Sequence, residues 1–150
     1  MTIYEELKKY ALDCFFDKIP SCQKHKWACS RFLRDTEKAE SGNFKYVWNE
    51  KEAQKIVKWF KYLRHSKGVL AGKPIELNIH QKFTLCQLYG WRNKENGRKR
   101  FNKSFKEVAR KNAKTQEEAG VVLYEMSVQA IKNGEVYECY CAGTKKEQSK

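Results

Sequence analysis

A lysine followed by a threonine, at positions 114 and 115, is the pair whose chemistry best suits a bound nucleotide. In a P-loop, the backbone N–H groups of a turn and of the helix after it surround the phosphates. The lysine reaches the β and γ phosphate oxygens, and the Ser or Thr hydroxyl binds Mg²⁺. Here the basic turn 110–115 follows an apolar stretch, 105–109, and precedes a segment with helical spacing. This order of strand, loop and helix predicts that ATP and Mg²⁺ bind at the turn.

The turn departs from the standard P-loop pattern at two positions. The pattern asks for glycine where this chain has Val108 and Ala113. Glycine at the second position lets the loop adopt a positive φ and approach the phosphates, whereas alanine in that conformation costs about 1 kcal/mol. We therefore expect weakened nucleotide affinity.

Each residue of the turn has a role in this interpretation. Lys114 would contact the β and γ phosphates and Thr115 would bind Mg²⁺. The residues that would line the phosphates are Arg110, Lys111, Asn112 and Ala113. The alternative for Thr115 is an ordinary N-cap, and for the other basic residues of the turn it is general basic character. For Lys114 the alternative is a surface lysine, although a cation is disfavoured at the positive end of a helix.

The charge of the chain is strongly positive, with a net value of +13 in 150 residues. Residues 92–114 hold ten Lys and Arg against two Glu. Such a stretch suits an anionic partner, either nucleic acid or nucleotide phosphates, and the alternative is a solvated face. The N-terminus is charged within five residues and no apolar run approaches the ~18 residues of a membrane span, so we expect a cytoplasmic protein without a membrane partner.

The six cysteines are expected to be reduced in that compartment, and most to be small buried hydrophobic residues. Cys22, His25 and Cys29 nevertheless share nearly one face of a helix, which raises a metal site as an alternative. Their spacing lacks a CxxC pair, and a fourth ligand has no obvious source.

Apolar periodicity and turn residues predict the elements that must position the loop. The expected helices cover residues 1–17, 21–38, 50–63, 78–91 and 115–132, and an Asn96-Gly97 turn predicts a hairpin. A buried strand over 136–142 would pair in parallel with 105–109 through a right-handed crossover. Thr144 to Glu147 has the pattern of a capping box that starts another helix.

Two stretches carry a resemblance to a known family. The segment EVARKNAKT, residues 107–115, resembles the deviant Walker A motif of phage terminase large subunits, which lacks the first glycine. The segment GKPIELNIHQKF, residues 72–83, resembles the block that precedes it. Near the end, the residues that resemble the family's Ala-Thr-Lys segment are Gly143, Thr144, Lys145 and Gln148.

The resemblance implies an α/β fold of the P-loop NTPase type, with an incomplete parallel sheet and a helical N-terminal segment. Residues 1–75 would form that segment and residues 76–150 the start of the ATPase core. Gln81 would make paired hydrogen bonds to adenine, although His80 stands where the family has tryptophan. The partners implied are double-stranded DNA, the terminase small subunit and the portal protein, in the bacterial host cell.

The resemblance also bears on catalysis. No apolar strand ending in an acidic residue follows Thr115 in these residues, so a Walker B segment and the nuclease domain of the family are not recognised. We therefore expect the N-terminal fragment of a terminase large subunit that binds ATP weakly and does not hydrolyse it alone. The alternatives are a stand-alone basic nucleic-acid-binding module and an inactive prophage remnant.

Overall fold

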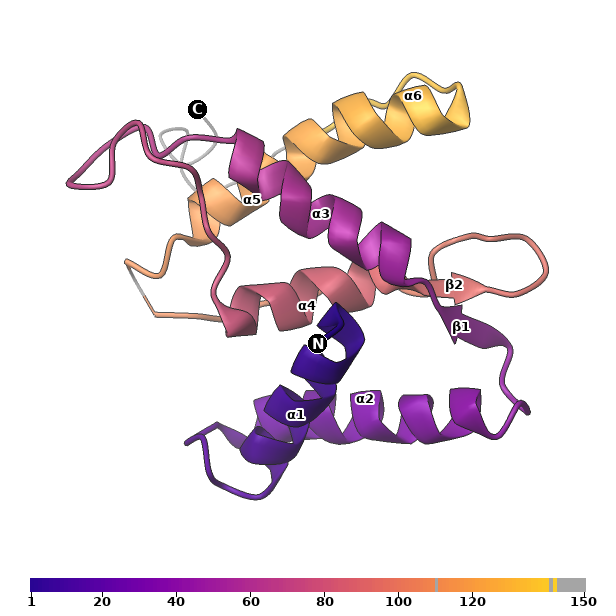
Figure 1. Ribbon diagram of the computed structural model, residues 1–150. Coiled ribbons are helices and arrows are strands. Elements are labelled where there is room, and N and C mark those ends of the chain that lie inside the picture. The colour runs from indigo at the N-terminus through magenta and orange to yellow at the C-terminus, as the bar shows by residue number, and fades with distance from the viewer. Residues whose placement is uncertain (110, 141, 143–150) are drawn as a thin grey trace. The chain divides into compact units, whose positions relative to one another are not determined.

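The computed structural model describes residues 1–109, 111–140 and 142, and the chain divides into two compact units. The first unit is Met1–Phe105 and the second is Lys106–Lys150 (Figure 1). The boundary suggested by the sequence, after residue 75, does not coincide with this division, because the helix that follows it packs against helices of the N-terminal unit.

Four helices make up most of the N-terminal unit. They are α1 (Ile3–Phe15), α2 (Gln23–Glu40), α3 (Glu50–Tyr62) and α4 (Ile79–Gly90). Helix α1 packs mainly on α2, and α3 mainly on α4, while α1 also contacts α3 and α4. The four helices expected in this part of the sequence are confirmed.

A two-stranded antiparallel sheet joins the helices of this unit. Strand β1 (Tyr46–Trp48) pairs with β2 (Trp91–Asn93), and Trp48 lies opposite Trp91 in the register. The expected hairpin is confirmed, because the Gly97 amide donates to the Asn93 carbonyl at 2.9 Å and Arg92 forms an antiparallel bridge with Lys99.

The core of the unit is aromatic and centres on the buried ring of Phe32. This ring makes edge-on contacts with Phe83, Trp48 and Trp91, at centroid separations of 5.5 to 6.3 Å. Such tilted contacts are the favoured geometry for aromatic pairs. Gly90 permits the packing at the end of α4, since a Cβ there would lie 2.8 Å from carbon atoms of the Trp48 ring.

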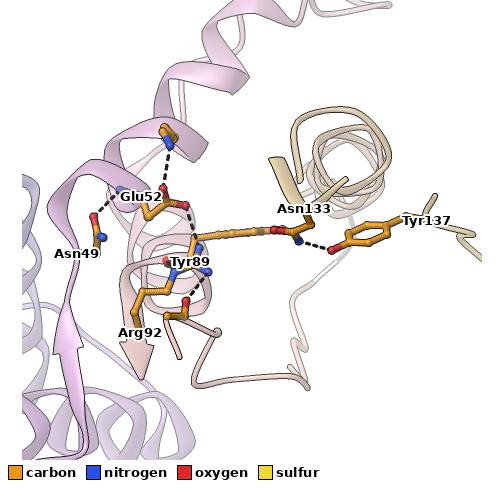
Figure 2. Close-up of polar contacts among 8 residues, drawn as sticks. Asn49, Glu52, Tyr89, Arg92, Asn133 and Tyr137 are labelled. Carbon is orange, nitrogen blue, oxygen red and sulfur yellow. Dashed lines mark hydrogen bonds and ion pairs between the residues drawn. The ribbon is translucent and has the colours of Figure 1, made fainter. Parts of the chain in front are cut away.

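The C-terminal unit is built on one helical segment. Helix α5 (Lys114–Tyr124) continues through a π-helical turn (Glu125–Gln129) into α6 (Ala130–Asn133), where Gly134 ends it with φ 66°. The expected helix over 115–132 is confirmed, with the π turn as an addition that periodicity did not predict. Asn133, the last residue of α6, donates from its side-chain amide to the Tyr137 hydroxyl (Figure 2).

The expected parallel sheet is wrong for the part of the chain that the structure describes. Residues 105–109 and the described part of 136–142 contain no strand, and the sheet that does form is antiparallel. Phe105 and Val136 are 85% and 95% exposed, so these two apolar residues do not pack in a sheet. A strand without a hydrogen-bonded neighbour gains little over an open chain. The helix expected from Thr144 lies outside the described residues.

Within the described ranges, no helix combines the length and the apolar character that crossing a membrane requires.

Candidate nucleotide site

The predicted phosphate loop adopts a left-handed backbone at two of its residues. Lys111 has φ 67° and Ala113 has φ 53°, although neither is glycine. Between them, the Asn112 side-chain amide donates to the Ala109 carbonyl at 3.0 Å and closes the turn. Residues other than glycine avoid this conformation, at a cost of about 1–2 kcal/mol each. Ala113 therefore adopts the positive φ that a phosphate loop requires at this position, and it carries the associated strain.

The loop leads directly into the N-terminus of α5. Ala113 is the N-cap, and it offers no side-chain hydrogen bond to the amides of the first turn. Lys114 and Thr115 occupy the first two helical positions and are exposed. Thr115 is therefore not the N-cap that the alternative interpretation required. A helix start whose cap residue supplies no acceptor retains N–H groups and a partial positive charge that suit an anion.

An ion pair behind the loop was not apparent in the sequence. Lys106 Nζ lies 2.6 Å from both carboxylate oxygens of Glu117, which faces inward from the first turn of α5 and is 5% exposed. An unpaired carboxylate here would repel a phosphate, and the lysine neutralises it. The two residues are eleven positions apart and belong to different segments, so no periodic pattern connects them.

Gln81 lies in the N-terminal unit, whereas the loop lies in the other. It occupies the third position of α4, where its side-chain Oε1 accepts from the Asn78 backbone N–H at 3.0 Å and its backbone N–H donates to Asn78 Oδ1 at 2.9 Å. This reciprocal pair is a capping box. The side-chain oxygen that adenine recognition would use already has a donor. Arg110, the first residue of the predicted loop, lies outside the described residues.

Three cations of the basic stretch 92–114 are neutralised by acidic residues elsewhere. Arg92 is 7% exposed and donates to Glu52 at 3.0 Å (Figure 2), and Arg100 pairs with Asp35 at 2.5 Å. Lys106 pairs with Glu117 as described. Part of the charge that suggested an anionic partner therefore serves to hold the fold together.

A second group of side chains with ligand chemistry lies between α1 and α2. Cys14, His25 and Cys29 have ligand atoms within 4.8 Å of one another, whereas Cys22 is exposed at the start of α2. The spacing in the sequence grouped Cys22 with His25 and Cys29, and this grouping is wrong. In the structure Cys14, from the neighbouring helix α1, takes the place of Cys22. Burial raises the pKa of the Cys29 thiol to about 12. The pKa of His25 is lowered, mainly by burial and to a smaller extent by the charge of His80.

Comparison with protein families gives a match that covers residues 79–150. The matching family is described as terminase large subunit, ATPase domain. The matched residues include α4, the loop and the helical segment of the C-terminal unit. Comparisons with curated proteins and with solved structures gave no match.

Proposed function

Residues 79–150 of this chain belong to the ATPase-domain family of the terminase large subunit, and from this premise we propose that the loop before α5 binds the phosphates of ATP. The chain would then be the nucleotide-binding part of a motor that packages double-stranded DNA. The terminase small subunit and the portal protein would be its partners in the host cytoplasm.

The observation that carries this proposal is the backbone of the loop. Ala113 keeps a positive φ directly before a helix whose first residues are Lys114 and Thr115. Residues in sparsely populated backbone regions persist where the surroundings impose them, and such residues concentrate at ligand sites. The same conformation turns the backbone amides of a phosphate loop toward one anion.

The residues then have distinct roles in the proposed site. Lys114 would bind the β and γ phosphates, Thr115 would ligate Mg²⁺, and the backbone of 111–113 would enclose the phosphates. Arg110 would add positive charge to the loop.

Hydrolysis needs groups beyond those of binding. An acidic residue at the end of an apolar strand must hold Mg²⁺ and help to orient water, and these 150 residues offer none after Thr115. We therefore propose that the chain binds ATP weakly and does not hydrolyse it by itself.

Thermal unfolding with and without Mg-ATP tests the proposal. At about a hundredfold excess over Kd, a bound ligand adds roughly 2.7 kcal/mol to the free energy of unfolding, which is visible as a shift in Tm. We expect this shift in the wild type and in Lys58→Ala, which removes an exposed lysine of α3. We expect it to disappear in Lys114→Ala. A cooperative transition that ATP does not move in any variant would reject the proposal.

A nucleic-acid-binding module is the second candidate, favoured by the ten Lys and Arg in residues 92–114. Its affinity for DNA would fall steeply with salt and would not depend on nucleotide. The ion pairs of Arg92, Arg100 and Lys106 reduce the charge available to such a partner. An inactive prophage remnant would respond to neither ligand.

A further inference from the structure

We propose that Cys14, His25 and Cys29 form a zinc site that ties α1 to α2. The three side chains come from two helices that pack against each other, and their ligand atoms lie within 4.8 Å of one another. Nothing in the nucleotide chemistry of the loop requires these residues, so the zinc site and the proposed function are independent of each other.

The ligand set is one that zinc prefers. Zinc binds thiolate sulfur at about 2.3 Å and imidazole nitrogen at about 2.0–2.1 Å, so ligand atoms of a tetrahedral site lie roughly 3.5–3.8 Å apart. The observed separations are at most 4.8 Å, so they exceed this by no more than about one ångström. Small side-chain movements would close this gap without displacing either helix.

The positions of the ligands follow from the helices. His25 and Cys29 are four residues apart on α2, so they lie on the same face one turn apart. Cys14 lies near the end of α1, the principal packing partner of α2. Both thiols are fully buried in the contact between the helices, which keeps them from bulk oxidants and competing ligands.

The imidazole is held in place by its neighbours. The Tyr10 hydroxyl lies 3.0 Å from His25 Nε2, and the ring of Phe83 contacts the His25 ring edge-on at 5.6 Å. Groups behind a metal-binding histidine commonly fix its orientation in this way. His25 is the most exposed of the three residues, and a site with three protein ligands takes water as its fourth ligand.

Titration of the reduced full chain with Co²⁺, a spectroscopic substitute for Zn²⁺, tests the site. We expect equimolar binding, with the visible bands of a tetrahedral ion and the ultraviolet charge-transfer band of thiolate ligands, and we expect Zn²⁺ to displace the Co²⁺. Cys22→Ala removes an exposed thiol outside the cluster and should leave both bands unchanged.

Variants of the ligands should separate their contributions. Cys29→Ala should lower the charge-transfer intensity by about half, because one of two thiolates is lost, and His25→Ala should weaken binding by more than about tenfold. Removal of metal with EDTA should lower the Tm of the wild type, and it should lower that of Cys29→Ala by less, because the variant holds the metal more weakly.

Two results would overturn the assignment. The first is a reduced wild-type chain that binds no Co²⁺, or binds it without a thiolate band; this measurement does not depend on the folding of any variant. The second is a folded Cys29→Ala chain with the spectrum and affinity of the wild type, which would place the metal elsewhere.

Discussion

Glu50, the first residue of α3, accepts a hydrogen bond from the backbone amide of Ile3 at 2.7 Å and so caps the N-terminus of a different helix, α1. Its other oxygen accepts from the Trp48 indole at 2.9 Å and from the Tyr4 amide at 3.3 Å. One carboxylate therefore joins α1, β1 and α3. Two helix N-termini meet at this negative charge, which both helix dipoles favour.

The contribution of Glu50 to stability should depend on pH. Partial burial raises its pKa, but the hydrogen bonds from Trp48, Ile3, Gln54 and Tyr4 outweigh burial and hold the pKa below its usual value. A lowered folded-state pKa means that the stabilisation is complete above the unfolded-state pKa of about 4.3 and is lost as the pH falls through the lower folded-state pKa.

Glu50→Gln should therefore lower the free energy of unfolding by about 1–2 kcal/mol near pH 7 and by less as the pH falls below about 4. Urea unfolding at a series of pH values measures this difference. Glu76→Gln, a change at an exposed carboxylate, serves as the control and should cost little at any pH. An equal cost for Glu50→Gln at pH 3 and pH 7 would contradict the argument.

The buried pair of Glu52 and Arg92 should respond differently to single and double substitution. Glu52→Gln leaves the Arg92 guanidinium buried without its carboxylate, which typically costs about 3–5 kcal/mol. Replacing both residues, as in Glu52→Leu with Arg92→Met, removes the unpaired charge and should cost less than the single change. Urea denaturation measures both. A double variant less stable than Glu52→Gln would show that Arg92 acts chiefly through its bonds to the carbonyls of Tyr89 and Gly97.

Ala113→Gly should tighten binding of Mg-ATP by up to about fivefold, since glycine lacks the Cβ that keeps the loop backbone from approaching the phosphates closely. The strain already present at Ala113 in the free loop would instead be relieved as added stability. Isothermal titration calorimetry measures the affinity. Ala119→Gly is the matched control, because this alanine lies within α5 and its replacement should cost about 1 kcal/mol of helix stability without helping ATP. Unchanged affinity in Ala113→Gly would mean that nucleotide does not contact this loop.

Gly90→Ala should destabilise the N-terminal unit by about 1–3 kcal/mol, because the new methyl group would lie 2.8 Å from the far edge of the Trp48 ring. Trp48→Phe removes those ring atoms and should compensate for part of the loss. The test is a double-mutant cycle by thermal unfolding, in which the two changes together should cost less than the sum of the single costs. Simple additivity would argue against the contact.

The helices of the N-terminal unit could be predicted because their signals are local. The apolar side chains that mark each helix are three or four positions apart. The Asn78 and Gln81 side chains, which form the capping box of α4, are equally close in the sequence. The hairpin at Asn96-Gly97 was predictable for the same reason. The contacts of Glu52 with Arg92 and of Lys106 with Glu117 join separate segments, and no periodicity encodes them.

The errors have the same origin. Apolar residues at 105–109 and 136–142 suggested strands, but a strand also needs a neighbour, and local pattern does not say whether one is present. Spacing grouped Cys22 with His25 and Cys29 along one helix, whereas packing brings Cys14 from another. The loop backbone at Ala113 could be anticipated only because the resemblance to a phosphate loop required it.

The π-helical turn between α5 and α6 has a consequence for insertions and deletions. A π turn holds one residue more than the α-helical turn it replaces, so deleting one residue within Glu125–Gln129 would leave a regular helix with both flanks in phase. The same deletion within α5 would rotate everything after it by about 100° and move its inward face to solvent. The C-terminal unit therefore contains one short segment that can lose a residue without loss of register.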